Sequence, residues 1–413
     1  MSDVDEQQPI PRHRSRAWLT GAGVVALGAL LAGCAKNAPQ DTWQPAGENA
    51  RKIDDLQRPV FAIAGVVLVL VCGVVGFCIV KFRDRGQDMP EQSHGKPALE
   101  IALTIIPAVI LLITGVFTVK TVFALAKTSD TQCIINVTGQ QWWWEYDYPV
   151  QSGCMDGGIT APIVTSGELV IPANEHVLLH ITSRDVIHSF WIPRLNGKRD
   201  AVPGRDQTLR MEADQPGIYD GQCTEFCGLS HARMRMAAVS LNSADFATWV
   251  GNQLEAYTPP EAGTLAATGE STFISQCSRC HQVNGLTTTV NGVQTPVLSN
   301  PDEYLVSGSA PNLTNLMTRT TFAGATFDLL TADCKKKLYD ASPDEFGQLY
   351  LQGVTPDCFD EAKLRSWIRD APAMKPMYSG EDQLTDGKYR GMPHLTLTEN
   401  QIDELVAYLQ QRK

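Results

Sequence analysis

Two apolar runs near the start of the chain dominate its pattern of hydrophobic and polar positions. Residues 59–80 and 99–119 are 22 and 21 residues long and almost free of charged side chains. At a rise of about 1.5 Å per residue, a helix of either length crosses the roughly 30 Å hydrocarbon core of a bilayer. The pattern therefore predicts a transmembrane hairpin over residues 59–119.

The loop between the two runs is basic. The stretch "KFRDRGQDMPEQSHGK" carries Lys81, Arg83, Arg85 and Lys96, and an excess of Lys and Arg marks the cytoplasmic side of short membrane loops. We therefore expect both ends of the hairpin, and everything after about residue 120, on the outer face of the membrane. Cysteines in that compartment are able to form disulfides or to bind metals.

The N-terminus resembles an export signal. Three arginines precede "AWLTGAGVVALGALLAGC", which matches a charged region, a short apolar region and a cleavage site. The tetrapeptide "LAGC" resembles a bacterial lipobox, in which cleavage leaves Cys34 as a lipidated N-terminus; an ordinary signal peptide or a retained anchor with an incidental cysteine is the alternative. We expect a lipoprotein-type signal peptide over residues 1–33 and an exported segment over residues 34–58, associated with lipid of a bacterial cell membrane.

From residue 130 to residue 250 the pattern changes to short β-rich runs. The runs "CIINVTGQQWWWEYDY", "ELVIPANEHVLLHITS" and "MAAVSL" are separated by Pro, Gly, Asp and Asn, which is typical of a Greek-key β-sandwich or barrel. Function in such folds sits on the loops that connect the strands. One of these loops, "GQCTEFCGLSHARM" at residues 221–234, contains two cysteines, a histidine and a methionine.

The residue types in this loop favour copper. Thiolates, imidazoles and a thioether are ligands that suit copper, whereas a structural zinc site normally uses only cysteine and histidine. A second imidazole is needed, and His188 in "RDVIHSFWIP" is the strongest candidate. His176 and His180 are expected to be strand residues with hydrogen-bond partners. A disulfide between the two cysteines and a mononuclear copper site are the alternatives that residue types alone leave open.

Net charge and cysteine content narrow the function further. The chain of 413 residues is long enough for two or three domains, and its net charge of −11 argues against nucleic acid as a partner, since that binding requires clustered Lys and Arg. Eleven cysteines are too many for an ordinary cytosolic enzyme and too few for a disulfide scaffold of this length. We expect structural disulfides between Cys133 and Cys154 and between Cys334 and Cys358.

A second chemical motif follows a stretch rich in Pro, Gly, Ala and Thr, which we interpret as a linker over residues 251–265. Beyond it, Cys277, Cys280 and His281 form the C-x-x-C-H pattern of covalent c-type haem attachment. Thioredoxin-like and zinc interpretations leave the adjacent histidine unexplained. The motif therefore predicts a haem c domain in the last third of the chain.

The other haem contacts are implied by resemblance. The stretch "GMPHLTLTENQIDELVAYLQ" resembles the end of class I cytochromes c, where the axial methionine precedes a capped C-terminal helix, and this favours Met392 over its competitors Met374 and Met377. "APNLTNL" resembles the cytochrome segment whose proline carbonyl orients the proximal histidine, which implies that role for Pro311. We expect an all-α class I cytochrome c domain over residues 266–413.

The copper motif carries a resemblance as well. "DVIHSFWIP", "AVPGRDQT", "PGIYDGQCTEFCGLSHARM" and "GQQWWWEYDY" resemble the binuclear copper domain of cytochrome c oxidase subunit II, and "LEIALTIIPAVIL" resembles the second membrane helix of that family. The resemblance implies a cupredoxin-like domain over residues 130–250 with a CuA centre of two copper ions. Its ligands would be the bridging thiolates of Cys223 and Cys227, the side chains of His188, His231 and Met234, and the backbone carbonyl of Glu225.

The same resemblance implies two further roles. The side chain of Glu225 would help to hold a magnesium ion at the border with the catalytic subunit. Trp142, the first of three consecutive tryptophans, would be the residue through which electrons reach the copper centre from a cytochrome. Trp143 and Trp144 are interpreted as strand core.

Together these motifs resemble a subunit II of a haem-copper terminal oxidase with a fused cytochrome c, of the caa3 type. The resemblance implies an oxidoreductase subunit of a proton-translocating respiratory complex, with cytochrome c or a cytochrome bc complex as the electron donor. Oxygen would be reduced to water in subunit I, with subunit III as a further partner. The alternatives are a nitric-oxide-reducing relative, a nitrous-oxide reductase and a copper-delivery or assembly protein; the last two leave the haem motif unexplained.

Overall fold

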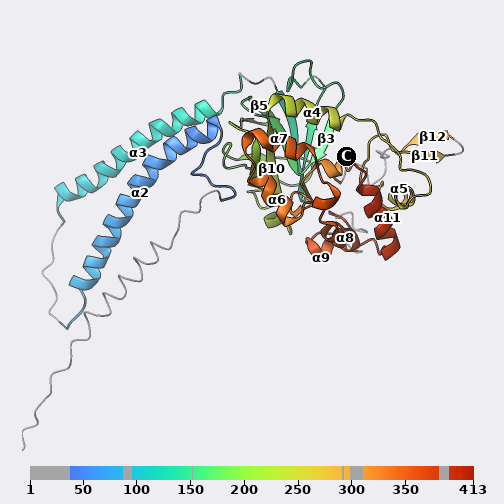
Figure 1. The fold of residues 1–413 in the computed structure, drawn as a ribbon. Coiled ribbons are helices and arrows are strands. Elements are labelled where there is room, and N and C mark those ends of the chain that lie inside the picture. The colour runs from blue at the N-terminus through green and yellow to red at the C-terminus, as the bar shows by residue number, and fades with distance from the viewer. Residues whose placement is uncertain are drawn as a thin grey trace, which may run out of the picture. The chain divides into compact units, whose positions relative to one another are not determined.

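Two long helices contain the apolar runs. In the computed structural model, α2 (Glu48–Lys81) and α3 (Pro97–Leu125) run side by side (Figure 1). Both are long and apolar enough to cross a membrane, and their apolar side chains are exposed, with Leu68 at 64% and Phe123 at 75%. The predicted hairpin therefore corresponds to two helices, each of which extends beyond its apolar run.

The structure describes residues 38–86, 95–129, 131, 133–150, 152–290, 293–297, 310–380 and 390–413. The predicted signal peptide, Cys34 and the middle of the predicted cytoplasmic loop lie outside these residues. Residues Gln40–Lys413 belong to one unit, and all contacts reported below lie within it.

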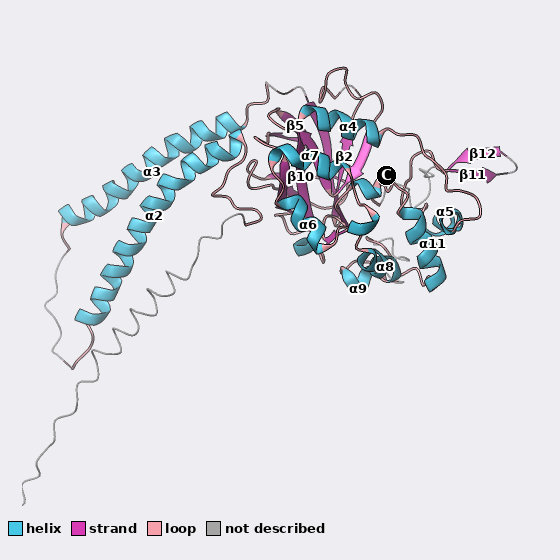
Figure 2. Cartoon of the chain, in the orientation of Figure 1, coloured by secondary structure: helices cyan, strands magenta, loops and turns pink. Residues whose placement is uncertain are grey.

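A β-sandwich with mixed strand directions follows the hairpin (Figure 2). In its larger sheet the central strand β1 pairs antiparallel with β2 and parallel with β5. In its smaller sheet the central strand β10 pairs antiparallel with β9 and parallel with β4. In sheet order, the larger sheet is β3 (Ile163–Ser166), β2 (Trp143–Tyr148), β1 (Cys133–Gln140), β5 (Val177–Ser183) and β8 (Gln207–Met211), the smaller is β4 (Glu168–Pro172), β10 (Arg235–Leu241) and β9 (Gly217–Gln222), and β6 (His188–Phe190) pairs with β7 (Arg199–Ala201).

The sandwich buries alternate residues of its strands. Along β1, Cys133 and Ile135 are 1% and 0% exposed while Ile134 and Asn136 are partly exposed, the period-two pattern of a strand with one face in the core. The Trp144 and Phe190 rings meet edge to face with centroids 5.2 Å apart. A disulfide joins Cys133 to Cys154, so this predicted pairing is confirmed. The cupredoxin-like β fold expected from the sequence is confirmed too.

Helices dominate the C-terminal domain, but the hairpins β11–β12 and β13–β14 depart from the all-α domain that was expected, and the class I cytochrome c fold stays a prediction. Helix α5 packs against α11, and Gly269 permits their close approach, because a Cβ atom there would lie 1.9 Å from the carbonyl oxygen of Glu404. Thr398 is the N-cap of α11 and forms a capping box with Gln401. The domain elements are α5 (Leu265–Gln276), β11 (Thr287–Val290), β12 (Val293–Pro296), η2 (Leu316–Thr318), β13 (Thr321–Phe322), β14 (Phe327–Asp328), α6 (Ala332–Tyr339), α7 (Pro343–Leu351), η3 (Pro356–Cys358), α8 (Glu361–Arg369), α9 (Ala371–Met374) and α11 (Glu399–Leu409).

Two further elements complete the description of the chain. The 3-10 turn η1 (His231–Arg233) lies between β9 and β10, and helix α4 (Ser243–Gln253) follows β10 and packs on the smaller sheet. A second disulfide joins Cys334 in α6 to Cys358 in η3. The predicted pairing of these two cysteines is therefore confirmed.

Candidate metal and haem sites

The predicted ligand side chains converge at one end of the β-sandwich. The Sγ atoms of Cys223 and Cys227 are 3.9 Å apart. His188 Nδ1 lies 4.0 Å from Cys223 Sγ, while His231 Nδ1 and Met234 Sδ lie 3.6 and 3.8 Å from Cys227 Sγ. Two sulfur atoms at the centre with one imidazole beside each is the arrangement that a sulfur-bridged metal pair requires.

The loop between β9 and β10 supplies nearly all of these donors. The carbonyl oxygen of Glu225 lies 3.4 Å from Cys223 Sγ, and the Cys223 N–H donates to the carbonyl of Met234 at 3.0 Å. The side chain of Glu225 is exposed at the surface. His188 alone comes from another element, the start of β6.

Asp185 orients His188. Its Oδ1 atom lies 2.8 Å from His188 Nε2, so that Nδ1 is the ring nitrogen directed at Cys223. Burial alone would lower the pKa of His188, but its hydrogen bonds to Asp185 and Cys223 outweigh burial and raise that pKa. A carboxylate behind a histidine is the common device that fixes the tautomer of a metal ligand.

The two thiols are strongly coupled. The hydrogen bond from Cys227 lowers the pKa of Cys223 to about 4, against the opposing effect of burial, and hydrogen bonds from His188 and the Ser189 N–H act in the same direction as Cys227. The same contact with Cys223 raises the pKa of Cys227. Because thiolates are the form that binds metals, the local fold already favours one deprotonated sulfur.

The donor set fits copper. Cys223, Cys227 and Met234 are 4%, 3% and 0% exposed, so the sulfur atoms face one another inside the domain. A thioether beside two thiolates and two imidazoles is unusual for zinc and ordinary for copper.

The two histidines that were not chosen as ligands have other partners. His180 Nδ1 is 2.7 Å from Asp206 Oδ2, and His176 Nε2 is 3.2 Å from both Glu48 Oε2 and Glu212 Oε2. The expectation of a strand residue with a polar partner is confirmed for His180 in β5, whereas His176 has polar partners but lies one residue before that strand.

Trp142 joins the copper loop to the C-terminal domain. Its indole Nε1 donates to the carbonyl of Cys227 at 2.9 Å, and its ring lies 5.4 Å, centroid to centroid, from the ring of Tyr378. Trp142 is only 3% exposed. A single aromatic side chain thus touches a copper-loop backbone and a residue of the cytochrome domain.

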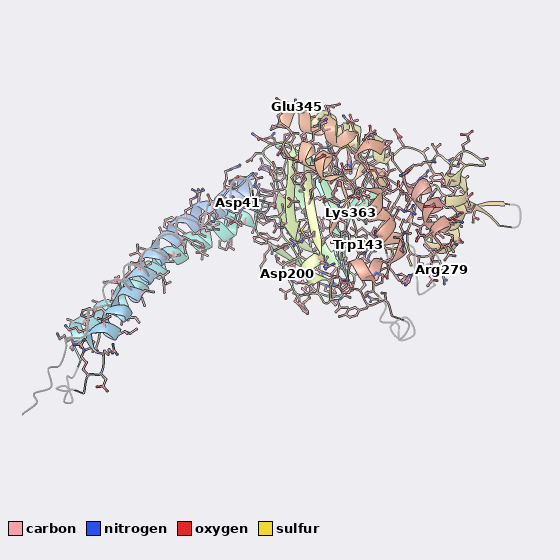
Figure 3. All side chains as sticks on the ribbon, turned by 60° about the horizontal axis from the view of Figure 1, so that its bottom comes forward. Asp41, Trp143, Asp200, Arg279, Glu345 and Lys363 are labelled. Atoms are coloured by element: carbon pink, nitrogen blue, oxygen red, sulfur yellow. A yellow bond between two sulfur atoms is a disulfide. The ribbon has the colours of Figure 1, made fainter. Side chains whose placement is uncertain are left out.

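A cavity of about 750 Å³ lies between the C-x-x-C-H motif and this tryptophan. Its volume falls in the range of cofactor pockets, and its mixed apolar and polar lining is typical of them. Trp143, labelled in Figure 3, lines the cavity beside Trp142; its interpretation as strand core missed this contact. The cavity wall includes Cys277, Cys280, His281, Pro311, Met377 and Met392.

His281 is held as a haem ligand would be. Its Nδ1 lies 2.7 Å from the carbonyl oxygen of Pro311, and donation of the Nδ1 hydrogen to that oxygen makes Nε2 the ligand atom. Burial lowers the pKa of His281, which favours the neutral imidazole that binds metals. The residues present therefore fit a covalent haem.

The three competing methionines differ in position. Met377 and Met392 both line the cavity, whereas the described lining does not include Met374, whose carbonyl accepts a hydrogen bond from Arg233. The sulfur of Met377 accepts the Met392 N–H at 3.3 Å. Met377 thus supports the backbone of the favoured residue.

Comparisons with known proteins identify the family of this chain. The chain matches the family model of the "Cytochrome C oxidase subunit II, periplasmic domain" over residues 133–241 and that of the subunit II transmembrane domain over residues 39–121. Cytochrome c oxidase subunit 2 of Bacillus sp. (strain PS3) is 32% identical over 95% of this chain and 96% of that protein. Subunit 2 of Alkalihalophilus pseudofirmus is 34% identical over 65% of this chain and 79% of that protein. The crystal structure of the periplasmic domain of subunit II from Bradyrhizobium japonicum is 31% identical, covers 31% of this chain and 96% of that chain, and gives a TM-score of 0.26.

Two apolar helices and a β-sandwich with clustered thiols and imidazoles define a membrane-anchored electron-transfer subunit of the copper-binding class. The chain belongs to the cytochrome c oxidase subunit II family. It is therefore the electron-accepting subunit of an oxidoreductase complex of the respiratory chain, and subunit I is its partner. The similarity to the PS3 protein extends over the C-terminal domain as well.

Three residues near these sites went unnoticed in the sequence. Asp185 had a usable signal, since an acidic residue three positions before a ligand histidine is a common orienting partner. Tyr378 and Lys375 gave none, because "APAMKPMY" has the composition of an ordinary surface loop.

Proposed function

We propose that this subunit accepts electrons at a covalent haem c, passes them through a binuclear CuA centre and delivers them to subunit I, where oxygen is reduced to water. The observation that carries the proposal is the position of Trp142, which bonds to the copper loop and lines the cavity of the C-x-x-C-H motif. One residue then borders both redox sites.

Cys223 and Cys227 would bridge two copper ions. His188 and Met234 would complete one ion, and His231 with the carbonyl of Glu225 would complete the other. A bound copper pair supplies one-electron storage spread over both metals. The chain contributes a buried and pre-formed donor set, which keeps rearrangement small and leaves no position for a substrate.

Cys277 and Cys280 would anchor the haem through thioether bonds, with His281 and Met392 as axial ligands. A haem with His and Met ligation supplies a reversible one-electron couple at a raised potential. Pro311 holds the imidazole orientation, and the sulfur of Met377 restrains the Met392 backbone.

The surface around the copper loop supports a protein partner. Ile187, Phe226 and Leu229 are 45%, 77% and 54% exposed, and they flank the ligands His188, Glu225 and Cys227. Exposed apolar side chains grouped at a site mark an interaction surface. This surface would meet subunit I, with a magnesium ion held partly by the exposed carboxylate of Glu225.

The remaining assignments follow from the same proposal. The copper and haem domains would lie on the outer face of the bacterial cell membrane, with residues 1–33 as a lipoprotein-type signal peptide and Cys34 as its lipidated residue. The domain limits would be residues 59–119, 130–250 and 266–413. Cytochrome c or a cytochrome bc complex would donate electrons, and subunit III would join the complex.

Metal counting on the purified complex tests the proposal. We expect two coppers and one covalent haem per chain, a spectrum of a mixed-valence copper pair, and reduction of copper after reduction of the haem. A mononuclear copper signal or zinc in this site would refute the binuclear assignment.

Oxygen uptake by the complex, compared with nitric oxide consumption, separates the oxidase from a nitric-oxide-reducing relative.

A further inference from the structure

Residues 319–358 form a segment that contributes little to the haem cavity. Its first residues, up to Gly324, reach the cavity wall, but no described residue from Ala325 to Cys358 lines it. The segment comprises β13, β14, α6, α7 and η3 and is closed by the Cys334–Cys358 disulfide. Because most of this segment is folded and crosslinked but does not line the cavity, we expect it to have a function other than haem binding.

A buried carboxylate of the copper domain receives its hydrogen bonds from this segment. Glu168, at the start of β4, is 2% exposed. Its Oε1 accepts from the Thr320 N–H at 2.9 Å, the Thr320 hydroxyl at 2.7 Å and the Thr321 hydroxyl at 2.8 Å, and its Oε2 accepts from the Tyr350 hydroxyl at 3.0 Å. Hydrogen bonds to a charged acceptor are stronger than neutral ones. Glu168 thus attaches residues 319–358 to the copper domain through four hydrogen bonds.

Arg319 connects the same contact to the haem ligand. Its guanidinium is buried and donates to the Ser166 hydroxyl at 2.8 Å in the copper domain and to the Asn312 carbonyl at 2.5 Å in the cytochrome domain. Asn312 directly follows Pro311, whose carbonyl orients His281. The position of the haem ligand is therefore tied to the copper domain through one side chain.

A second contact lies between α7 of the segment and α4 of the copper domain. Gln348 donates to Asp245 Oδ1 at 2.6 Å. The two helices approach so closely that a Cβ atom on Gly347 would lie 1.9 Å from Asp245 Oδ2. Figure 3 labels Glu345, which belongs to the same helix α7. A larger residue at position 347 would therefore displace the Asp245 side chain.

A third contact involves Trp142, the residue proposed to carry electrons to the copper centre. Lys375 is 3% exposed, and its Nζ donates to the carbonyl oxygens of Trp142 and Ala323, each at 2.8 Å. One ammonium group thereby joins the backbone of the tryptophan to the start of the segment. Tyr378 lies against the ring of the same tryptophan.

We propose that residues 319–358 are a docking segment, with Glu168 as its anchor, that holds the cytochrome domain in one fixed orientation on the copper domain. Electron transfer then needs no search by a tethered domain. The residues that would hold the haem and those that would hold the copper pair then keep one fixed separation, so the transfer of one electron from a reduced haem to an oxidised copper pair would require no bond or proton to move. The inference rests on the proposed function, because it concerns the same two redox sites.

The physical reason is that the contacts are buried and mutually dependent. Glu168, Arg319 and Lys375 each place a polar or charged group inside the interface, and such groups are costly when their partners are lost without water to replace them. Partial separation is therefore unfavourable. The domains stay docked or separate completely.

Time-resolved electron transfer in the purified full complex tests this. The haem is photoreduced by a ruthenium complex, and copper reduction is followed at several sucrose concentrations. The wild-type protein should show one phase whose rate does not depend on viscosity. A viscosity-dependent rate would show that the domain must move before each transfer, and this would overturn the proposal without affecting the proposed function.

Two variants should weaken the contact between the docking segment and the copper domain, each in a different way. Glu168→Gln keeps the shape but removes the negative charge that strengthens the four hydrogen bonds to this side chain, and Gly347→Ala adds a single methyl group against Asp245. Each should slow transfer about tenfold and make it viscosity-dependent, as expected when a conformational step becomes limiting, with haem and copper spectra unchanged. The matched controls are Glu261→Gln, an exposed linker carboxylate, and Gly251→Ala, where a Cβ atom meets nothing within 4 Å.

Hydrogen exchange gives a readout that is independent of both cofactors. The Thr320 amide, which bonds to Glu168, should exchange about tenfold faster in Glu168→Gln, the change expected if loss of the negative charge weakens this hydrogen bond by about 1.4 kcal/mol, and at the wild-type rate in Glu261→Gln. Wild-type transfer rates and exchange in both docking variants would refute the docking segment alone. Absence of haem or of a copper pair from the wild-type complex would instead refute the proposed function and this inference with it.

Discussion

Removing the disulfide between Cys334 and Cys358 should loosen the docking segment. The two cysteines are 24 residues apart in the sequence, and a crosslink of that span reduces the entropy of the opened segment by an amount worth about 3.5 kcal/mol. In the variant with both cysteines replaced by serine, α7 should therefore open more often. Since about 1.4 kcal/mol corresponds to a factor of ten, its amides should exchange on the order of 300-fold faster.

The assay is hydrogen exchange with mass spectrometry on the intact complex, following peptides of α7. The matched control replaces Cys72 and Cys78, two free and exposed cysteines of α2, by serine and should leave α7 unchanged. Unaltered α7 exchange in the variant without the disulfide would refute the loop-entropy argument, and it would indicate that contacts with the copper domain alone determine the opening.

Three further predictions concern the redox sites. Met234→Leu should alter the copper spectrum while the haem band stays the same, because its sulfur lies in the thiol cluster; a change in the haem band alone would contradict the ligand assignment. Trp142→Phe keeps a ring but removes the hydrogen bond to Cys227, and transfer from haem to copper should slow about tenfold if that bond contributes about 1.4 kcal/mol to the barrier, measured with metal content unchanged. Met392→Leu should abolish the absorption of a methionine-ligated ferric haem and lower its potential, whereas Met377→Leu should retain both; the reverse pattern would make Met377 the ligand.

The sequence allowed the cluster of candidate copper ligands to be predicted because local spacing determines most of its geometry. The donors of Cys223, Cys227, His231 and Met234 lie on one loop, so their separation in the chain limits their separation in space. His188 was found by chemistry, as the imidazole best placed at the end of a strand. The structure adds the partner that no spacing indicates, Asp185 behind that imidazole.

The contacts between the domains could not be predicted from local patterns. Glu168 opens an ordinary strand sequence, "ELVIP", and its donors lie more than 150 residues further along the chain. Lys375 likewise lies in a short loop, where a lysine is normally exposed. Only the tertiary fold shows that these polar groups are buried together, so for the segment 319–358 the sequence predicted no more than the disulfide between Cys334 and Cys358.

Helix α2 runs without a break from the β-sandwich domain through its apolar run. The helix begins with Glu48, paired to Arg210, and with Asn49, which donates to the Arg210 carbonyl at 3.2 Å, and it continues to Lys81. Because an α-helix turns about 100° per residue, one residue inserted just before Pro59 would rotate the whole lipid-facing half against the copper domain. The number of residues between Glu48 and Pro59 therefore determines which face of the apolar half of α2 is directed at neighbouring helices.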